Sequence, residues 1–379
     1  MKVLVLSTVH RWNEPRLFHK VACTLAREHE VILCAIGDGE ERTVDNVLVR
    51  QIGTWRSRYD RLQLWRRARR EILRIKPDVI HFHSPELALI LLPVALFTRK
   101  KLIFDVHEDP VGGYAERKWI PKPLKGITKL VLPLLFRMSP RVFDTVILAE
   151  DSYIPHFLQR DNVHVIHNYA IIPDPDVPFR DHYRDFNPQK ELRLVYFGQL
   201  TVQRGAWQMI EMAKILLRSF PSLHLDLIGE VQPRSLSDEL ERAASELGGA
   251  VRLHGFVEFN QAVASLQQAH LGLVPLQPHP NFMGSFSTKF FDYMTYGLPF
   301  VVTDMPFWRR FVEENPCGVV ADTAKPEGFA ETVIQLVQDT EKLRDLSHHG
   351  YRLVRDKFRW EAERLLQIYR DLESSKEDS

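Results

Sequence analysis

Cysteine is scarce in this 379-residue sequence: Cys23, Cys34 and Cys317 are the only three, and they lie far apart. Their number and spacing exclude a disulfide scaffold and a cysteine-rich zinc site, and they fit a reducing compartment. The longest apolar runs, Leu87–Phe97 and Leu130–Phe136, are too short to cross a bilayer. The first ten residues lack the apolar core and cleavage site of a signal peptide, so we expect a cytoplasmic protein.

The sequence also has no G-x-G-x-x-G motif, internal repeat or low-complexity tract. Without the glycine motif, the interpretation of the chain as an ordinary Rossmann dehydrogenase loses its main support. Hydrophobic residues make up 45% of the chain, which is ample for the two domains expected at this length. The net charge is only +1, but residues 1–168 carry 27 Lys and Arg against 19 Asp and Glu. This basic first half and acidic second half indicate two domains with different partners.

Short apolar strands alternate with amphipathic helices in both halves, which predicts an α/β protein with two doubly wound domains. The first set of expected strands is 2–7, 31–36, 78–82, 102–105 and 145–149. The pattern restarts after a proline-rich stretch, with strands at 192–198, 223–229, 251–253, 271–274, 300–302 and 318–320. We therefore expect a domain at 1–170, a linker at 171–190 and a second domain at 191–357. Ligands of such folds bind in loops that directly follow strands.

One such loop follows the strand that ends at Gly198 and leads into a helix near Gly205. A glycine at 198 lets a ligand approach the backbone closely. Arg204 precedes a helix N-terminus, where free amides and the helix dipole already favour an anion. A guanidinium there can hold a diphosphate through two hydrogen bonds, although an ordinary surface arginine explains the loop equally well.

A second candidate begins a helix within residues 281–294. Ser287 is a good N-cap residue, so we expect the helix to start near Thr288, with its first amides and Lys289 available to a phosphate. Asp292 shares that helix face, and its carboxylate could accept hydrogen bonds from both ribose hydroxyls of a nucleotide. An N-capped helix with a solvated Lys–Asp pair is the alternative.

Titratable side chains gather after two strands of the first half. The segment Asp105–Pro110 follows an apolar strand, a position typical of active sites, and His107 there can donate a hydrogen bond to a sugar. His81 and His83 lie at the end of another strand. Because they alternate along a strand instead of sharing a helix face, we expect no metal site. Structural and functional roles are equally supported for His83.

Two stretches combine many basic residues with an apolar stripe at helical spacing. Trp55–Lys76 has nine Lys and Arg against two acidic residues, and Arg117–Arg141 places lysines among leucines and valines. Each suits a helix on an anionic lipid surface, and each also suits a helix packed on its own sheet. Together they favour association with the inner face of the cell membrane. Nucleic acid is a poorer partner, since no recognised binding motif accompanies the charge.

Several segments together resemble glycosyltransferase family 4, the group 1 glycosyltransferases, whose GT-B fold has two Rossmann-like domains facing each other across a cleft. The resemblance covers nearly the whole chain and is nearest to bacterial enzymes that build surface polysaccharides. It implies that a terminal helix at 358–379 returns to the first domain. The segments that carry it are EPRLFHKVACTLAREHEVIL, PDVIHFHSPELALI, LIFDVHEDP, VHVIHNY, YFGQLTVQRG, RLHGFVEF, GLVPLQPHPNF, STKFFDYMTYGLPFVVTDMPFW and FRWEAERLLQIYRDL.

The resemblance implies that the second domain binds a nucleotide-diphosphate sugar, of the UDP or GDP type, and that no cofactor or metal is needed. Arg204 and Lys289 would neutralise the diphosphate, Asp292 would bind the ribose, and His107 would contact the transferred sugar. His107, Arg204 and Lys289 are therefore the implied catalytic residues. The other implied donor contacts are Gly198, Phe256, Val257, Ser287 and Thr288. The implied contacts with acceptor or sugar are His10, Arg16, His83, Glu108, Asp109, Gly284 and Ser285.

The implied reaction retains the anomeric configuration by front-face displacement, with the leaving diphosphate accepting the proton of a lipid-linked or oligosaccharide acceptor. The protein then supplies positioning and electrostatic stabilisation. The chain departs from the family pattern at three places. Gly284 stands where a glutamate is expected, Gln199 stands where many members have arginine, and STVHRWNEP replaces a glycine-rich loop after the first strand. Recognition of the donor sugar is therefore expected to differ.

Two other functions are compatible with the same residues. A sugar-nucleotide epimerase can share the fold, and it would alter the donor with no acceptor present. A non-catalytic module that binds polysaccharide or scaffolds a synthesis complex would bind no donor at all. Donor binding and acceptor dependence therefore separate the three possibilities.

Overall fold

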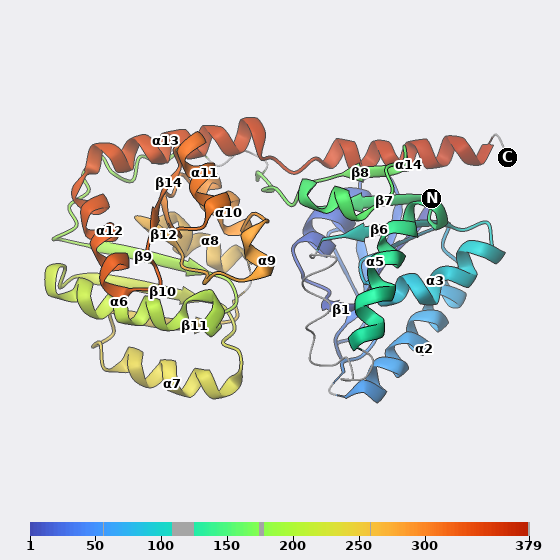
Figure 1. Ribbon diagram of the computed structural model, residues 1–379, viewed down its shortest axis with the longest axis horizontal. Helices are drawn as coiled ribbons and strands as arrows, with labels where there is room; N and C mark the ends of the chain where they lie inside the picture. Colours follow the sequence, from blue (N-terminus) through green and yellow to red (C-terminus); the bar gives the residue numbers. More distant parts are fainter. Residues whose placement is uncertain (56, 108–124, 174–177, 258, 378–379) are drawn as a thin grey trace. The chain divides into compact units, whose positions relative to one another are not determined.

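The computed structural model describes residues 1–379 except 56, 108–124, 174–177, 258 and 378–379, and the chain divides into two compact units (Figure 1). The first unit comprises Met1–Asn168 and Trp360–Ser379, and the second comprises Tyr169–Arg359. The stretch 171–190, expected as a linker, belongs to the second unit. Tyr183 is buried there, and its hydroxyl donates a hydrogen bond to the His270 carbonyl at 2.7 Å.

The first unit is built on an eight-stranded sheet in the order β3-β4-β2-β1-β5-β6-β7-β8. Neighbouring strands are parallel except β3 and β4, which are antiparallel. The central strands are runs of Val, Ile and Leu because helices cover both faces of the sheet. The strands are β1 (Lys2–Arg11), β2 (Glu30–Ile36), β3 (Arg42–Val44), β4 (Val47–Gln51), β5 (Val79–Phe82), β6 (Lys101–Val106), β7 (Thr145–Leu148) and β8 (Val163–Val165).

The sequence pattern does not predict β3, β4 or β8, and it makes β1 too short. β3 and β4 form a hairpin that turns at Asp45 and Asn46, whose φ angles are 48° and 62°. Asn and Asp tolerate this left-handed conformation, so the Asp-Asn pair between two valines was a usable hairpin signal. Because β1 extends to Arg11, much of the segment STVHRWNEP, which was expected as a loop after the first strand, is strand.

Alternate residues of the strands point to two separate cores in the first unit. One core lies beneath α2 (Arg58–Ile75), α3 (Pro85–Phe97), α5 (Lys125–Val142) and the 3-10 helix η3 (Asp151–His156). The other lies beneath the π-helix η1 (Arg16–Ala22), α1 (Cys23–Leu25) and the last helix, α14 (Ala362–Glu377). Within the described residues, no helix is long and apolar enough to cross a membrane.

The second unit has a six-stranded parallel sheet in the order β11-β10-β9-β12-β13-β14. The chain runs outward from β9 to β11 and then returns to the other side of β9 with β12, so the strand order reverses between β9 and β12. Ligands of doubly wound sheets bind at the carboxyl ends of strands at such a reversal. The strands are β9 (Leu192–Phe197), β10 (Leu223–Ile228), β11 (Val251–Gly255), β12 (Leu271–Val274), β13 (Phe300–Thr303) and β14 (Gly318–Ala321).

Helices surround this second sheet and connect its strands (Figure 1). In chain order they are the 3-10 helix η4 (Val202–Arg204), α6 (Ala206–Ser219), α7 (Arg234–Ser245), α8 (Phe259–Gln268), α9 (Pro280–Met283), α10 (Thr288–Thr295), α11 (Pro306–Glu314), α12 (Pro326–Gln338) and α13 (Thr340–Lys357). Two of them position residues of the site: η4, which follows β9, and α10, which precedes β13.

Candidate functional site

At the carboxyl end of β9, neighbouring atoms lie very close to the backbone of two glycines. Gly198 has a φ of +133°, and Gly229, at the end of β10, has a φ of +145°. A Cβ atom on Gly229 would lie 2.0 Å from the Gly198 carbonyl oxygen, and one on Gly198 would lie 2.9 Å from the Lys289 ammonium nitrogen. It would also lie 3.8 Å from the Arg204 guanidinium. The two cations predicted from separate loops therefore meet at Gly198.

Arg204 is placed there by a short capped turn. The Thr201 hydroxyl accepts a hydrogen bond from the Arg204 amide at 3.1 Å, which closes η4. Gly205 follows with a φ of +77°, and a Cβ atom there would lie 2.3 Å from the Pro275 carbonyl oxygen. Only glycine fits this position, so η4 lies directly against the loop that follows β12.

Lys289 lies in the first turn of α10, which begins at Thr288 as predicted. Ser287 occupies the N-cap position, but its side chain makes no capping hydrogen bond, contrary to expectation; its carbonyl accepts from the Phe290 amide at 3.0 Å. One turn on, the Tyr293 hydroxyl donates to the Leu273 carbonyl at 3.1 Å and accepts from the Phe197 amide at 3.2 Å. These bonds fix α10 on β9 and β12.

Burial changes the acid–base chemistry of the lysine. Lys289 is 6% exposed, and its Nζ lies 5.1 Å from the ring centroid of Tyr196. Burial and the neighbouring Arg204 charge lower the pKa of Lys289 from 10.5 to about 7, while Asp292 opposes the change. Two cations held together in a buried place are costly alone and are stabilised by an anion. The pair is therefore suited to a dianionic ligand such as a diphosphate.

The remaining predicted donor residues lie on neighbouring loops of the second unit. Phe256 is 56% exposed and, with Val257, follows β11. The end of β11 is joined to that of β10, because the Gly229 amide donates to the Gly255 carbonyl at 2.8 Å. Gly284 and Ser285 lie between α9 and α10. A Cβ atom on Gly284 would meet nothing within 4 Å, so this place has room for a ligand group.

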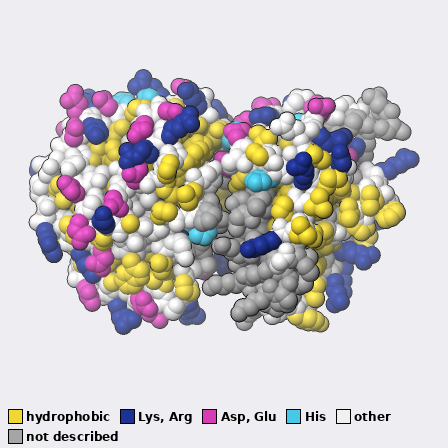
Figure 2. All heavy atoms as spheres, in the orientation of Figure 1, with side chains coloured by type: hydrophobic (Ala, Val, Ile, Leu, Met, Phe, Trp, Pro, Cys, Tyr) yellow, Lys and Arg dark blue, Asp and Glu magenta, His cyan; other side chains and the backbone are white. Residues whose placement is uncertain are grey.

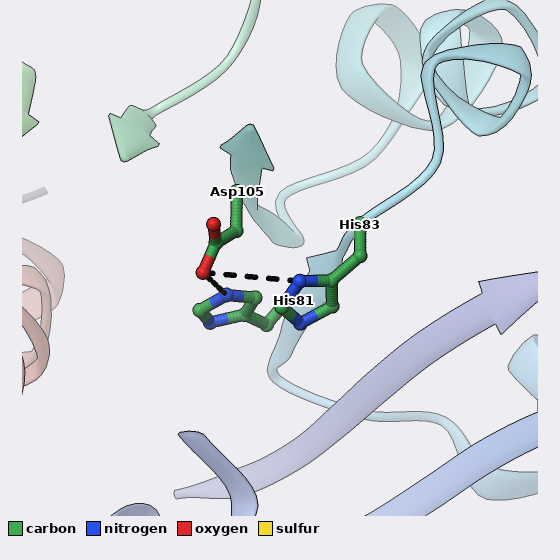
Figure 3. A group of neighbouring side chains, drawn as sticks. All are labelled: His81, His83 and Asp105. Carbon is green, nitrogen blue, oxygen red and sulfur yellow. Dashed lines mark hydrogen bonds and ion pairs between the residues drawn. The ribbon is translucent and has the colours of Figure 1, made fainter. Parts of the chain in front are cut away.

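A second cluster lies within the first unit, where Asp105 of β6 meets His81 of the neighbouring strand β5 and His83, which follows β5 (Figure 3). Arg16 is fully buried there; its Nε donates to the two Asp105 carboxylate oxygens at 3.0 and 3.2 Å. Burial opposes ionisation of Asp105, but Arg16 and His81 together lower its pKa to about 2. Arg16, expected at the acceptor, is thus placed in the interior and paired with a carboxylate.

His81 joins this ion pair to the last helix. Its Nε2 lies 3.3 Å from Asp105 Oδ2 (Figure 3), and its Nδ1 lies 2.9 Å from the Tyr369 hydroxyl of α14. Since a carboxylate only accepts, Nε2 carries the proton and Nδ1 accepts from Tyr369. The ligand atoms of His81, His83 and Asp105 lie within 4.8 Å of one another, a spacing that a metal ion could use. However, the Asp105 carboxylate already accepts from Arg16 and His81, and His81 Nδ1 is bonded to Tyr369, so we interpret the cluster as a hydrogen-bonded network.

Replacing Tyr369 with phenylalanine tests this network. The variant leaves the buried Nδ1 of His81 without a donor, so we expect the free energy of unfolding to fall by about 1–3 kcal/mol. Urea unfolding measures the change. Tyr59→Phe, at an exposed position of α2, is the matched control and should alter stability by less than about 0.5 kcal/mol. Equal effects of the two substitutions would contradict the network.

Three histidines predicted to contact substrate come together beside it. The His10 and His107 ring centroids are 4.7 Å apart, and those of His83 and His107 are 5.3 Å apart. Within the described residues, the buried ring nitrogens of His83 and His107 have no hydrogen-bond partner, and His83 Nδ1 lies 3.8 Å from Asp105 Oδ2 (Figure 3). Burial and the neighbouring histidines hold the pKa of both well below its usual range, so both rings are neutral at pH 7. Neutral imidazoles with unused nitrogens can bind sugar hydroxyls. Glu108 and Asp109 lie outside the described residues.

Each unit matches a different family model. Residues 191–339 match the model described as glycosyl transferases group 1, and residues 16–169 match the model described as glycosyltransferase family 4. A search of curated proteins found no match. Among solved structures, sucrose-phosphate synthase from Thermosynechococcus elongatus is similar, with a TM-score of 0.74, 16% identity and coverage of 99% of each chain.

Two further structures are similar over nearly their whole length. Anabaena HepE, solved in complex with UDP-glucose, gives a TM-score of 0.69 at 16% identity, over 99% of this chain and 100% of that one. WaaG, a glycosyltransferase involved in lipopolysaccharide biosynthesis, gives a TM-score of 0.69 at 15% identity, over 97% of this chain and 99% of that one. At these identities the likeness shows the fold. The two family matches and this shared fold identify the chain as a glycosyltransferase with the GT-B fold.

Proposed function

We propose that the protein transfers a sugar from a UDP- or GDP-linked donor to a lipid-linked or oligosaccharide acceptor in the assembly of a bacterial surface polysaccharide. The transfer retains the anomeric configuration and needs no metal or other cofactor. The observation that carries the proposal is the meeting of Arg204 and Lys289 at Gly198. This place lies at the reversal of strand order, where doubly wound sheets bind ligands.

The two cations promote breakage of the bond between the sugar and the diphosphate. As the bond between the sugar's anomeric carbon and the diphosphate lengthens, negative charge develops on the leaving diphosphate, and Arg204 and Lys289 stabilise it. The acceptor hydroxyl forms its bond to the same face of the sugar, and its proton passes to the departing diphosphate. No side chain has to act as a nucleophile, so the protein contributes position and charge.

The other donor contacts follow from the loops beside this pair. Asp292 stands one turn after Lys289 on α10 and binds the ribose hydroxyls. Phe256 and Val257, after β11, lie beside the base, and His107 binds a hydroxyl of the sugar. Proteins of the same fold support a nucleotide donor: HepE was solved with UDP-glucose, and TarM with UDP and an α-GlcNAc-glycerol.

The transfer reaction is tested in two steps. Thermal unfolding is first measured with UDP-glucose, GDP-mannose, dTDP-glucose and ADP-glucose, and the donor with the correct base raises Tm most. Nucleotide release is then measured with that donor and a synthetic polyprenyl-diphosphate-linked sugar. We expect release only with the acceptor present and at an unchanged rate in EDTA, because Arg204 and Lys289 take the place of a divalent cation. NMR of the product gives the anomeric configuration.

Each alternative predicts a different result. A donor that is isomerised with no acceptor present would show an epimerase. If none of the four donors shifted Tm, the result would favour a non-catalytic module. Loss of nucleotide release in EDTA, restored by added Mg²⁺, would contradict the metal-independent mechanism.

A further inference from the structure

Large apolar side chains are exposed mainly on three helices of the first unit. Phe97, at the end of α3, is 83% exposed, and Leu130 on α5 is 78% exposed. Exposed residues of this kind occur singly on most proteins, but a set concentrated on adjoining helices marks an interaction surface. Two from each helix represent the set: Leu62 and Leu73 on α2, Leu96 and Phe97 on α3, and Leu130 and Leu134 on α5.

The three helices form one continuous layer over one face of the sheet. Their inward residues share a single core, and α3 contacts α5 directly. α2 is joined to α3 by a buried ion pair between Arg61 and Glu86. Their outward sides therefore make up a single surface, which we call the α2–α3–α5 surface. Figure 2 shows apolar and basic side chains intermixed on this part of the molecule.

The exposed charge on this surface is basic. Arg66, Arg69, Arg70 and Arg74 are exposed along α2, and Lys129, Arg137 and Arg141 are exposed along α5. The helices contain three acidic residues, and each already has a local partner. Asp60 accepts from the Ser57 amide in a capping box, Glu71 pairs with Arg50, and Glu86 pairs with Arg61. No acidic residue occurs from 125 to 142.

We propose that the α2–α3–α5 surface binds the anionic lipid surface of a bilayer. Leu96 and Phe97 enter the headgroup region, and the arginines and lysines of α2 and α5 contact anionic phosphates. Interleaved apolar and basic side chains suit this partner because long basic side chains reach the headgroups while apolar tips go deeper. The core of a protein interface, by contrast, is poor in charged residues. This binding goes beyond sugar transfer and does not depend on it.

Vesicle co-sedimentation of the full chain tests the proposal. The probes are vesicles of 70% phosphatidylcholine with 30% phosphatidylglycerol, and vesicles of phosphatidylcholine alone. We expect at least a tenfold preference for the anionic vesicles at low salt, falling steeply in 0.5 M NaCl. The double variant Leu96→Ser, Phe97→Ser should bind at least tenfold more weakly. In the double variant Arg69→Gln, Arg70→Gln, the affinity for anionic vesicles should fall roughly fivefold for each arginine removed.

Matched controls come from the second unit. Ile171→Ser and Arg218→Gln remove an exposed apolar and an exposed basic residue there, and binding should stay as in the wild type. Equal binding to both kinds of vesicle, or unchanged binding of both double variants, would overturn the proposal. If the wild type instead forms a dimer that Leu96→Ser, Phe97→Ser dissociates in sedimentation velocity, the surface belongs to a second copy. Donor-induced shifts in Tm in the same samples report the sugar-transfer site separately.

Discussion

Arg204→Ala is expected to lower kcat for sugar transfer by roughly 10²–10³-fold, the usual effect of removing one group that stabilises charge in a transition state. The guanidinium lies beside Gly198, where the diphosphate is proposed to bind, and its contribution grows as the leaving group gains charge. Because Lys289 remains, nucleotide binding should weaken less than turnover falls. Steady-state kinetics of nucleotide release, together with calorimetry of nucleotide binding, separates the two effects.

Two substitutions control for loss of charge and for loss of fold. Arg204→Lys keeps the charge but cannot make two parallel hydrogen bonds, so it should recover only part of the rate. Arg218→Ala removes an exposed arginine of α6 in the same unit and should leave the rate unchanged. Unchanged turnover in Arg204→Ala would remove this residue from the proposed diphosphate site.

Lys289→Met is expected to weaken nucleotide binding and yet make the unliganded protein more stable. The fold lowers the pKa of Lys289 to about 7, so the unfolded chain binds a proton more tightly than the folded one. Below pH 7 this difference opposes folding in full, and it disappears as the pH rises towards 10.5. Since a tenfold change in proton affinity is worth about 1.4 kcal/mol, we expect a gain of roughly 5 kcal/mol at pH 6.

Urea unfolding of the wild type and Lys289→Met at pH 6 and pH 10 measures this gain. The gain should be large at pH 6 and small at pH 10. A destabilised variant at pH 6 would contradict the proposed role of burial. Tyr293 lies on the same helix face, and Tyr293→Phe is the matched control: it removes hydrogen bonds without altering charge, so it should destabilise the protein at both pH values.

The same lysine makes nucleotide affinity depend on pH. Above pH 7 the free protein loses the Lys289 proton, whereas the bound diphosphate favours the protonated form. The Kd for UDP or GDP should therefore rise by up to tenfold for each pH unit above 7. Calorimetry between pH 6.5 and 9 measures this slope. Lys289→Arg, whose side chain stays charged throughout, should show a much flatter profile.

The positions in the fold of the residues proposed to bind the donor could be predicted because each carries a local signal. Gly198 ends an apolar strand, Arg204 precedes a helix, and Thr288 follows a residue that favours N-caps. Apart from β3, β4 and β8, the strands of both sheets were predicted for the same reason, since fully buried strands are short runs of Val, Ile and Leu. Ser287 shows the limit of such signals: it stands at the N-cap, but its hydroxyl does not cap the helix.

The cluster in the first unit could not be predicted, because its partners are far apart in the sequence. The hydrogen bond between His81 and Tyr369 joins residues 288 positions apart, and the Arg16–Asp105 pair joins residues 89 apart. Nothing near Arg16 in the sequence indicates that a guanidinium will be buried, and an arginine near the end of a strand resembles a surface contact. Register between strands and the docking of α14 decide this arrangement, and both arise only from tertiary packing.

The docking of α14 also has a consequence for biosynthesis. A ribosome makes residues 1–168, then the whole second unit, and only then residues 360–379, which the first unit needs to complete one of its two cores. Until then, the part of this core against which Leu365, Leu366 and Tyr369 pack is uncovered in the nascent chain. The half of the protein that emerges first is therefore the half that matures last, and during elongation it is the part most in need of chaperones.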